Sequence, residues 1–278
     1  METVPARARD LFFGHFGIKA EEPGAAMLRA VVASFIEIPY ENITKIITKF
    51  SVEDPDRRMR DPVKVIEGYI SEGTGGTCFS LTWCLGSILS ESGFECHPVM
   101  ADMKRPNIHC ALVVTIGARR YYVDPGYLLS EPVELTGKVT RIATSFVDVE
   151  LRPRGPHKYD LYTIAGGEKK WRYLVRTTPV PTPLFVKYWK ESFGLPMMNS
   201  LQLTKLTRGG HLYIRDHHLR VQRGTKKTNE NIRSNMEKRI ETEFGIPGEV
   251  TARAREYIER MKESWRIQKR GNRGRANL

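Results

Sequence analysis

The sequence predicts an α+β protein in which helices come first, strands follow and mixed elements end the chain. Apolar residues recur at three- and four-residue steps up to Gly93, which is the helical period. From Phe94 onward the pattern changes to short β-rich runs separated by turn residues. The 278 residues can bury a full core, in one large domain or in two or three smaller ones.

The N-terminal part carries the clearest helical patterns. Residues 7–17 form a short aromatic helix, and a stronger amphipathic helix follows Pro23 and ends at Pro39. The span 48–61 is charged and is expected to be a loop. Pro62 then starts another short helix, because proline suits the first helical position.

A further helix is expected over residues 78–92. The glycine-rich link at 73–76 leads into it, Thr77 is its expected N-cap, and Gly93 follows its end. Cys78 therefore lies in the first turn. Free backbone N–H groups and the helix dipole favour a thiolate at that position.

The middle of the chain reads as an antiparallel sheet or small barrel, because its β-rich runs are short and closely spaced. We expect strands over residues 94–100, 108–116, 120–123, 133–135, 139–151, 158–164 and 170–175. Three prolines, at 179, 181 and 183, mark a boundary before the last part. That part is expected to hold a helix around residues 185–193, strands at 201–206, 210–214 and 217–221, and helices at 229–244 and 249–267.

Composition narrows the classes of protein. No segment approaches the roughly eighteen uninterrupted apolar residues of a membrane span, and the N-terminus lacks an export signal, so we expect a cytoplasmic protein without membrane contact. The net charge is +12, but residues 253–275 hold nine Lys/Arg against three Glu. Such a tail is typically solvated, and no aromatic-interleaved basic groove predicts nucleic-acid binding. The four cysteines include no Cys-x2-Cys pair, so no metal site is expected.

Three reactive side chains come in a suggestive order. Cys78 begins a helix, His109 begins an aliphatic strand, and Asp124 ends the next strand. A hairpin turning at Gly117 brings its two ends together, which predicts that His109 and Asp124 are neighbours. A histidine that takes the cysteine proton, oriented by an aspartate, converts a thiol of pKa about 8.5 into a nucleophile at neutral pH.

Ordinary structural roles account for the same residues. A lone cysteine on an amphipathic helix is commonly a core residue, and Cys84, Cys96 and Cys110 are expected to be of that kind. A histidine that enters a strand is commonly structural, and Asp-Pro-Gly is a common turn. Spacing alone leaves both interpretations open.

Four collinear motifs carry a family resemblance. Thr74-Gly75-Gly76-Thr77-Cys78-Phe79, His109-Cys110-Ala111-Leu112-Val113, Val123-Asp124-Pro125-Gly126-Tyr127 and, upstream, Ile38-Pro39-Tyr40-Glu41-Asn42 stand in this chain. They resemble the arylamine N-acetyltransferase family, whose motifs are Arg-Gly-Gly-x-Cys, a strand led by His, Val-Asp-x-Gly-Phe and Ile-Pro-Phe-Glu-Asn. Later segments resemble that family as far as residue 246.

The resemblance implies a papain/transglutaminase-like active-site core within a three-part architecture. Residues 1–93 would be a helical bundle with the nucleophile, 94–178 an antiparallel β-barrel with His and Asp, and 179–246 an α/β lid; 247–278 would add a helix and basic tail. It also implies ping-pong transfer of acetyl from acetyl-CoA, through Cys78, to an arylamine, hydrazine or related amine. The residues expected at the CoA thioester are Gly75, Gly76, Thr77, Gly126 and Tyr127.

One departure from the family bears on this expectation. Thr74 replaces the motif's arginine, which in the family would pair with the glutamate matching Glu41. A buried Glu41 therefore needs another partner, because an unpaired buried carboxylate is costly. The triad survives this change, but the identity of donor and acceptor does not follow from it.

Other functions are distinguished by their reactants. An amide synthase of the same family would take a carrier-bound acyl chain. A transglutaminase-like cysteine hydrolase would use the same Cys-His-Asp order on peptide amides, without CoA. An inert binder would use the basic tail on nucleic acid, with strongly salt-dependent affinity.

Overall fold

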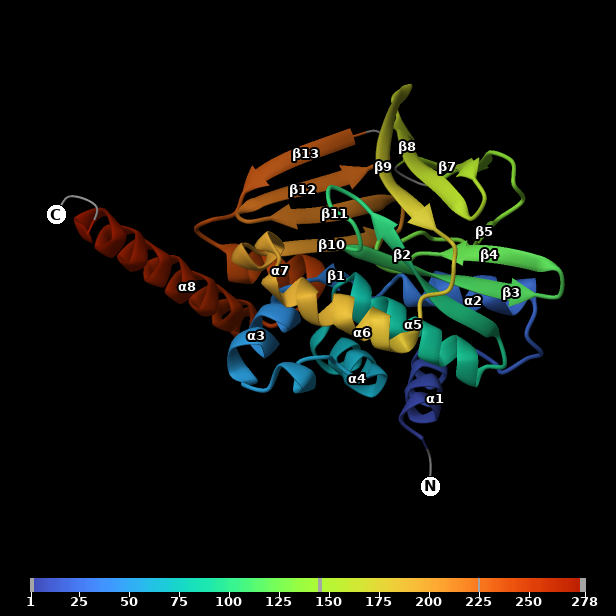
Figure 1. Ribbon diagram of the computed structural model, residues 1–278, viewed down its shortest axis with the longest axis horizontal. Coiled ribbons are helices and arrows are strands. Elements are labelled where there is room, and N and C mark those ends of the chain that lie inside the picture. The colour runs from blue at the N-terminus through green and yellow to red at the C-terminus, as the bar shows by residue number, and fades with distance from the viewer. Residues whose placement is uncertain (1–2, 145–146, 225, 276–278) are drawn as a thin grey trace.

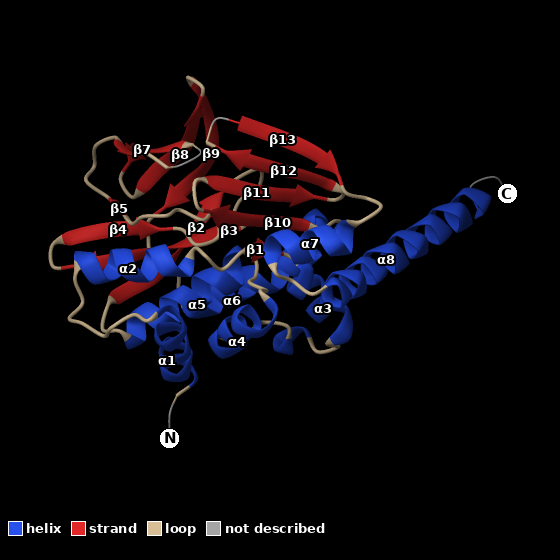
Figure 2. Cartoon of the chain, turned by 180° about the vertical axis from the view of Figure 1, so that it is seen from behind, coloured by secondary structure: helices blue, strands red, loops and turns tan. Residues whose placement is uncertain are grey.

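The computed structural model describes residues 3–144, 147–224 and 226–275. It combines helices with two antiparallel sheets, so the α+β prediction is confirmed (Figures 1 and 2). The helices gather on one side of the molecule and the sheets on the other. Among the described residues, no helix combines the length and the apolar character needed to cross a bilayer.

The N-terminal helices largely follow the predicted pattern. They are α1 (Val4–Phe16), α2 (Ala25–Phe35), α3 (Ile43–Ser51), α4 (Pro62–Glu72) and α5 (Cys78–Glu91), with a short 3-10 turn, η1, at Pro55–Arg57. Asp61 caps α4 by accepting a hydrogen bond from the backbone N–H of Lys64 at 3.0 Å. α5 packs against α1 and α4 and onto strands of the larger sheet.

The expected loop at 48–61 is wrong at its start, because residues 48–51 belong to α3. Ile43 and Ile46 on that helix are fully buried in a cluster with the smaller sheet and the C-terminal helices. Packing against segments far along the chain therefore stabilises α3. The charged residues at its end did not predict a helix.

The larger sheet forms a nearly closed barrel. Its eight strands run in the order β5-β4-β3-β2-β9-β8-β7-β6, and the edge strands β5 and β6 approach each other. The strands are β2 (Glu95–Asp102), β3 (His109–Ile116), β4 (Arg119–Val123), β5 (Val133–Glu134), β6 (Thr140–Ile142), β7 (Asp148–Gly155), β8 (Lys158–Ala165) and β9 (Glu168–Arg176). The single strand expected at 139–151 is thus two strands, which pair antiparallel with Thr140 opposite Leu151.

Strand β3 shows how the sheet divides its side chains between two cores. Ala111 and Val113 point into the barrel, whereas Cys110, Leu112 and Val114 belong to the cluster that contains α5. This alternation is the two-residue period of a strand with both faces buried. Neighbouring residues at the start of β3 therefore face different surroundings.

The smaller sheet has the order β1-β10-β11-β12-β13 and includes a short strand from the N-terminal part. Its strands are β1 (Tyr40–Glu41), β10 (Gln202–Thr207), β11 (Gly210–Arg215), β12 (His218–Arg223) and β13 (Lys226–Asn231). Helix α6 (Thr182–Glu191) and the 3-10 turns η2 (Ser192–Gly194) and η3 (Pro196–Asn199) precede β10, and α7 (Met236–Phe244) follows β13.

The helix expected at 229–244 begins too early. Residues 226–231 pair with β12 as an edge strand, and the helix starts at Met236. All six residues of β13 are polar and exposed, so no apolar period marks them as a strand. Main-chain hydrogen bonding to β12 determines their conformation instead.

Helix α8 (Gly248–Arg275) extends away from the body of the molecule (Figures 1 and 2). Val250, Ala254 and Ile258 near its start are buried in the cluster with the smaller sheet. The helix is longer than the predicted 249–267. Residues 276–278 of the basic tail lie outside the described residues.

Candidate active site

Cys78 is the first residue of α5. Thr77 has the extended backbone of an N-cap, although its side chain makes no capping hydrogen bond. Cys78 is 6% exposed, and its Sγ lies 3.9 Å from the carbonyl oxygen of Ile108, just before β3. The helix start thus places the thiol at the rim of the barrel.

The glycine-rich link before α5 is held against β1. The N–H of Glu41 donates to the carbonyl of Gly76 at 3.0 Å, and the N–H of Gly76 donates to Pro39 at 3.4 Å. A Cβ at Gly75 would lie 1.9 Å from the Pro39 carbonyl oxygen, so only glycine permits this approach. The two motifs therefore pack against each other and position the cysteine.

The structure identifies the partner that a buried Glu41 needs in place of the motif's arginine. It is fully buried and accepts hydrogen bonds from the backbone N–H and the hydroxyl of Thr44, at 2.9 and 2.6 Å. Burial raises the pKa of Glu41, and these bonds and the positive charge of Arg60 partly counteract that rise. Arg60 also donates to the carbonyl of Gly75 at 2.7 Å. A cation from the segment before α4 thus lies beside the link that contains Thr74.

His109 and Asp124 are hydrogen bonded across the β3–β4 hairpin. His109 Nε2 lies 2.7 Å from Asp124 Oδ2, and both side chains are buried. The turn at Gly117 has a φ of +57°, and Ile116 pairs with Arg119 across it. The structure therefore brings together the two residues that the hairpin length predicted to be neighbours.

Two tyrosines on the barrel interior complete the surroundings of Asp124. The hydroxyls of Tyr122 and Tyr173 donate to Asp124 Oδ2 at 2.9 and 2.5 Å, and the N–H of Tyr127 donates to Oδ1 at 2.8 Å. Neither tyrosine was predicted from the sequence. Tyr122 was predictable, because a residue two positions before Asp124 faces the same side of a strand. Tyr173 lies on β9, and no local sequence pattern indicated that it would contact Asp124.

The hydrogen bonds around Asp124 determine its ionisation. Burial alone would raise the pKa of Asp124, but the charge of His109 and the bonds from His109, Tyr173 and Tyr122 outweigh burial and lower it. For His109, burial favours the neutral ring, whereas Asp124 and Cys78 favour the charged ring and raise its pKa. The pair is thus an aspartate beside an imidazole that readily holds a second proton.

Gly126 lies where Cys78 and His109 meet. A Cβ added to Gly126 would lie 2.5 Å from Cys78 Cβ and 3.1 Å from His109 Cε1. The loop after β4 therefore contacts both side chains through a residue without a Cβ. Because Nε2 faces Asp124, the other ring nitrogen, Nδ1, is left for the thiol.

The pKa of Cys78 is lowered well below its usual value. A hydrogen bond from the Cys110 thiol contributes most, burial acts in the opposite direction, and a hydrogen bond and the charge of His109 add to the lowering. Cys110 itself is fully buried, and burial raises its pKa, so it stays a neutral donor. It faces α5, where its Sγ also reaches the Thr82 hydroxyl at 3.5 Å. From the sequence alone, Cys110 was expected to be only a core residue.

The residues predicted to bind CoA lie around the same thiol. Gly75, Gly76 and Thr77 precede it, and Gly126 touches it. The N–H of Tyr127 binds Asp124, and its ring meets that of Tyr173 edge-on at 5.3 Å. Their part in holding a thioester stays a prediction. In the described part of the chain, no group of three metal-ligating side chains gathers.

Comparisons with known proteins show the family and the fold of the chain. A family model described as N-acetyltransferase matches residues 25–252. No curated protein sequence matches the chain.

Solved structures with the same fold include three arylamine N-acetyltransferases. The Mycobacterium marinum protein in complex with CoA has a TM-score of 0.76 and 17% identity, over 90% of this chain and 98% of its own. The Mycobacterium smegmatis protein has a TM-score of 0.74 and 23% identity, over 89% and 97%. The Salmonella typhimurium protein has a TM-score of 0.74 and 16% identity, also over 89% and 97%.

Proposed function

The chain belongs to the N-acetyltransferase family, and from that premise we propose that it moves an acetyl group from acetyl-CoA to an arylamine, hydrazine or related amine. The transfer passes through a thioester on Cys78, in a ping-pong sequence. The observation that carries the proposal is the contact of a buried, low-pKa thiol with a histidine that is hydrogen bonded to a buried aspartate. CoA bound to the M. marinum structure supports the choice of donor.

In the first half-reaction, the Cys78 thiolate attacks the carbonyl carbon of the donor thioester. The carbon–sulfur bond to CoA breaks, and the leaving CoA thiolate takes a proton from the His109 imidazolium. Asp124 keeps the ring oriented throughout, because its Oδ2 holds Nε2. The products are acetyl-Cys78 and CoA–SH, and His109 is left neutral.

In the second half-reaction, the neutral His109 acts as the general base. The amine nitrogen attacks the acetyl carbonyl, His109 takes a proton from that nitrogen, and the bond to Cys78 Sγ breaks. This step releases the amide and restores the thiolate–imidazolium pair. One thiol serves both half-reactions, so the donor product leaves before the amine reacts.

Mass spectrometry tests the covalent step directly. Incubation with acetyl-CoA and no amine is expected to add one acetyl group to a peptide containing Cys78. Cys78→Ala is expected to lose both the adduct and turnover. The proposal would be contradicted if the wild type became acetylated without any adduct at Cys78. Full turnover by Cys78→Ala would contradict it as well.

Thiol titration tests the ion pair. Because the folded-state pKa of Cys78 is lowered, alkylation by iodoacetamide is expected to stay fast at pH values where an ordinary thiol, of pKa about 8.5, is protonated. In His109→Ala the alkylation rate of Cys78 is expected to fall once the pH drops below about 8.5, the pKa of an ordinary thiol. Cys96→Ser is a matched control, because Cys96 is partly exposed but its pKa is raised by burial.

The same assays separate the proposal from an amide synthase. A panel of thioesters on CoA and on a carrier protein is compared for the rate of Cys78 acylation. Preference for acetyl-CoA supports the acetyltransferase, whereas acylation only from the carrier favours the synthase.

A further inference from the structure

Two of the four cysteines meet at the start of α5. The thiol of Cys110 donates a hydrogen bond to Cys78, and both side chains are buried. All four cysteines are reduced thiols in the structure. Cys84 and Cys96 donate instead to backbone carbonyls, at 3.6 and 3.5 Å. A second thiol is therefore a feature of the surroundings of Cys78 in particular.

Contacts between α5 and β3 hold Cys110 beside the nucleophile. Cys78 Sγ lies 3.9 Å from the carbonyl oxygen of Ile108. One helical turn further on, the Thr82 hydroxyl donates to the Cys110 carbonyl at 3.2 Å, and Cys110 Sγ lies 3.5 Å from the same hydroxyl oxygen. Residues four apart on a helix lie one above the other, with Cβ atoms about 5–6 Å apart. The Cys110 sulfur thus packs on the face of α5 that carries Cys78.

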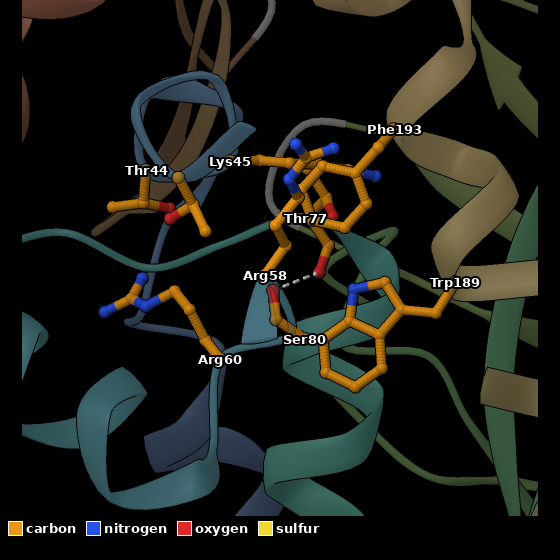
Figure 3. Close-up of a pocket in the computed structure, with 9 residues that line it drawn as sticks. Thr44, Lys45, Arg58, Arg60, Thr77, Ser80, Trp189 and Phe193 are labelled. Atoms are coloured by element: carbon orange, nitrogen blue, oxygen red, sulfur yellow. Dashed lines mark hydrogen bonds between the residues drawn. The ribbon is translucent and has the colours of Figure 1, made fainter. Parts of the chain in front are cut away.

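Cys78 is the thiol of the pair that an oxidant meets first. The hydrogen bond from Cys110, a hydrogen bond and the charge of His109, and the charge of Lys45 lower its pKa against the effect of burial. Lys45 and Thr77, the residue before Cys78, line the same small pocket (Figure 3). A thiolate that a reactant reaches is the form that hydroperoxides oxidise, whereas a fully buried neutral thiol such as Cys110 is protected.

Oxidation of Cys78 changes the surroundings of Cys110. Burial, followed by the hydrogen bond to Cys78 and the negative charge of Cys78, raises the pKa of the Cys110 thiol. A sulfenic acid at Cys78 is neutral, so the negative charge that holds the Cys110 proton disappears once the nucleophile is oxidised. The Cys110 thiol then loses its proton more readily, and its thiolate is the form that attacks a neighbouring oxidised sulfur.

We propose that Cys110 is a resolving thiol: a hydroperoxide oxidises Cys78, and Cys110 then closes a disulfide with it. The disulfide removes the nucleophile, so acyl transfer stops until a dithiol reduces the bond. The pair is a reversible modification site, which goes beyond the proposed function. It also keeps Cys78 from the irreversible sulfinic and sulfonic acids, because the sulfenic acid is consumed before a second hydroperoxide reacts.

The two steps need no reactant besides the hydroperoxide. The Cys78 thiolate attacks its terminal oxygen; a sulfur–oxygen bond forms, the oxygen–oxygen bond breaks, and the sulfur gives up two electrons. The leaving oxyanion takes a proton from the His109 imidazolium. The Cys110 sulfur then attacks the Cys78 sulfur; the sulfur–oxygen bond breaks, and hydroxide leaves with the Cys110 proton as water. A dithiol later restores both thiols by exchange and becomes a disulfide itself.

Peptide mapping of the full chain tests the disulfide directly. The wild type is treated with hydrogen peroxide without acetyl-CoA, blocked with iodoacetamide and digested without reductant. We expect the Cys78 peptide to be joined to the Cys110 peptide, with a mass lower by two hydrogens than the sum of the two. Dithiothreitol is expected to separate them. Absence of the joined peptide, whether Cys78 is oxidised or untouched, would overturn the inference.

Recovery of activity shows what the second thiol does. After peroxide and then dithiothreitol, the wild type is expected to regain most of its activity. Cys110→Ala is expected to regain several-fold less, because dithiothreitol does not reduce a sulfinic acid. The two are compared at equal initial loss, since the substitution also changes the pKa of Cys78. Cys84→Ala is the matched control, because Cys84 is equally buried on α5 and burial raises its pKa. Equal recovery by Cys110→Ala and wild type would contradict the resolving role.

Two readouts by mass keep this test separate from the proposed function. The joined peptide is detected in the wild type without any turnover. Dimedone traps sulfenic acids, and Cys110→Ala is expected to carry several-fold more dimedone on Cys78 than Cys84→Ala does. If acetyl-Cys78 forms but peroxide joins no peptides, the role of Cys110 is wrong and the acetyltransferase proposal stands. If the peptides are joined but no thioester acylates Cys78, the reverse holds.

Discussion

Two buried charges lie beside Cys78, and their surroundings in the protein differ. Asp124, on the barrel side, is fully buried and accepts four hydrogen bonds, one of them from His109. Lys45, on the α3 side, is almost as buried but has Ser192 Oγ as its hydrogen-bond acceptor. The first charge is complemented by hydrogen bonds from four groups, whereas the second faces the charge of the Cys78 thiolate and the ring of Phe193.

The difference separates the group that orients the base from the group that supports the charge of the nucleophile. A group that orients a base must be held before the substrate arrives, so its partners belong to the protein. A cation buried beside the nucleophile instead supports the negative charge of the thiolate, and Lys45 helps to lower the pKa of Cys78 in this way. Substitutions on the two sides are therefore expected to have different consequences for activity and for stability.

Asp124→Asn is expected to have the largest effect on activity. The amide has no charge to support the His109 imidazolium, and its NH₂ group turns a donor toward partners that themselves donate. We expect kcat/KM for acetyl transfer to fall about 10³- to 10⁴-fold. Steady-state kinetics with acetyl-CoA and an arylamine measures the loss. Asp102→Asn, at a partly exposed ion pair with Arg176, is the control; an equal loss in both variants would contradict the assignment.

Lys45→Met is expected to stabilise the fold. The pKa of Lys45 falls from 10.5 to about 8 on folding, which corresponds to a cost of about 3 kcal/mol when the group is charged. The unfolded chain keeps the proton between these pH values and the folded chain loses it. Wild-type stability therefore rises with pH across this window, and the full cost applies below it.

Thermal unfolding measures this stability effect. At pH 7 the midpoint of Lys45→Met is expected to exceed that of wild type by several degrees, since about 1 kcal/mol shifts a chain of this size by roughly 2–4 °C. The gap is expected to narrow as pH rises from 8 toward 10. A destabilised Lys45→Met variant at pH 7 would show that the surroundings of Lys45 offset its burial in full, and the comparison would then fail.

Tyr173→Phe is expected to have the smallest effect. It removes one of the two hydroxyls on Asp124 Oδ2 and leaves His109 in place. We expect a several-fold loss of kcat/KM, in line with about 1 kcal/mol for one hydrogen bond, together with a higher pKa of Asp124. The pH dependence of kcat/KM reports that change. Tyr162→Phe on β8, whose ring lies under Lys169, is the matched control away from the site.

Much of the fold was predictable where the pattern was local and strong. The helix after Thr77 and the hairpin through Gly117 follow from turn residues and apolar period within a few residues. Helix α3 and strand β13 did not follow, because their conformation depends on partners distant in sequence. The buried face of α3 packs with the smaller sheet, and β13 pairs as a wholly polar edge strand.

The sequence by itself determined that a cysteine begins a helix and that a histidine and an aspartate occupy the two ends of one hairpin. Those features are short-range, so propensity and loop length decide them. Only the tertiary structure decided that α5 meets the barrel at Gly126, that Tyr173 reaches Asp124 from 49 positions away, and that Lys45 is buried against Ser192. Each of these contacts depends on the packing of separate elements, which no local pattern encodes.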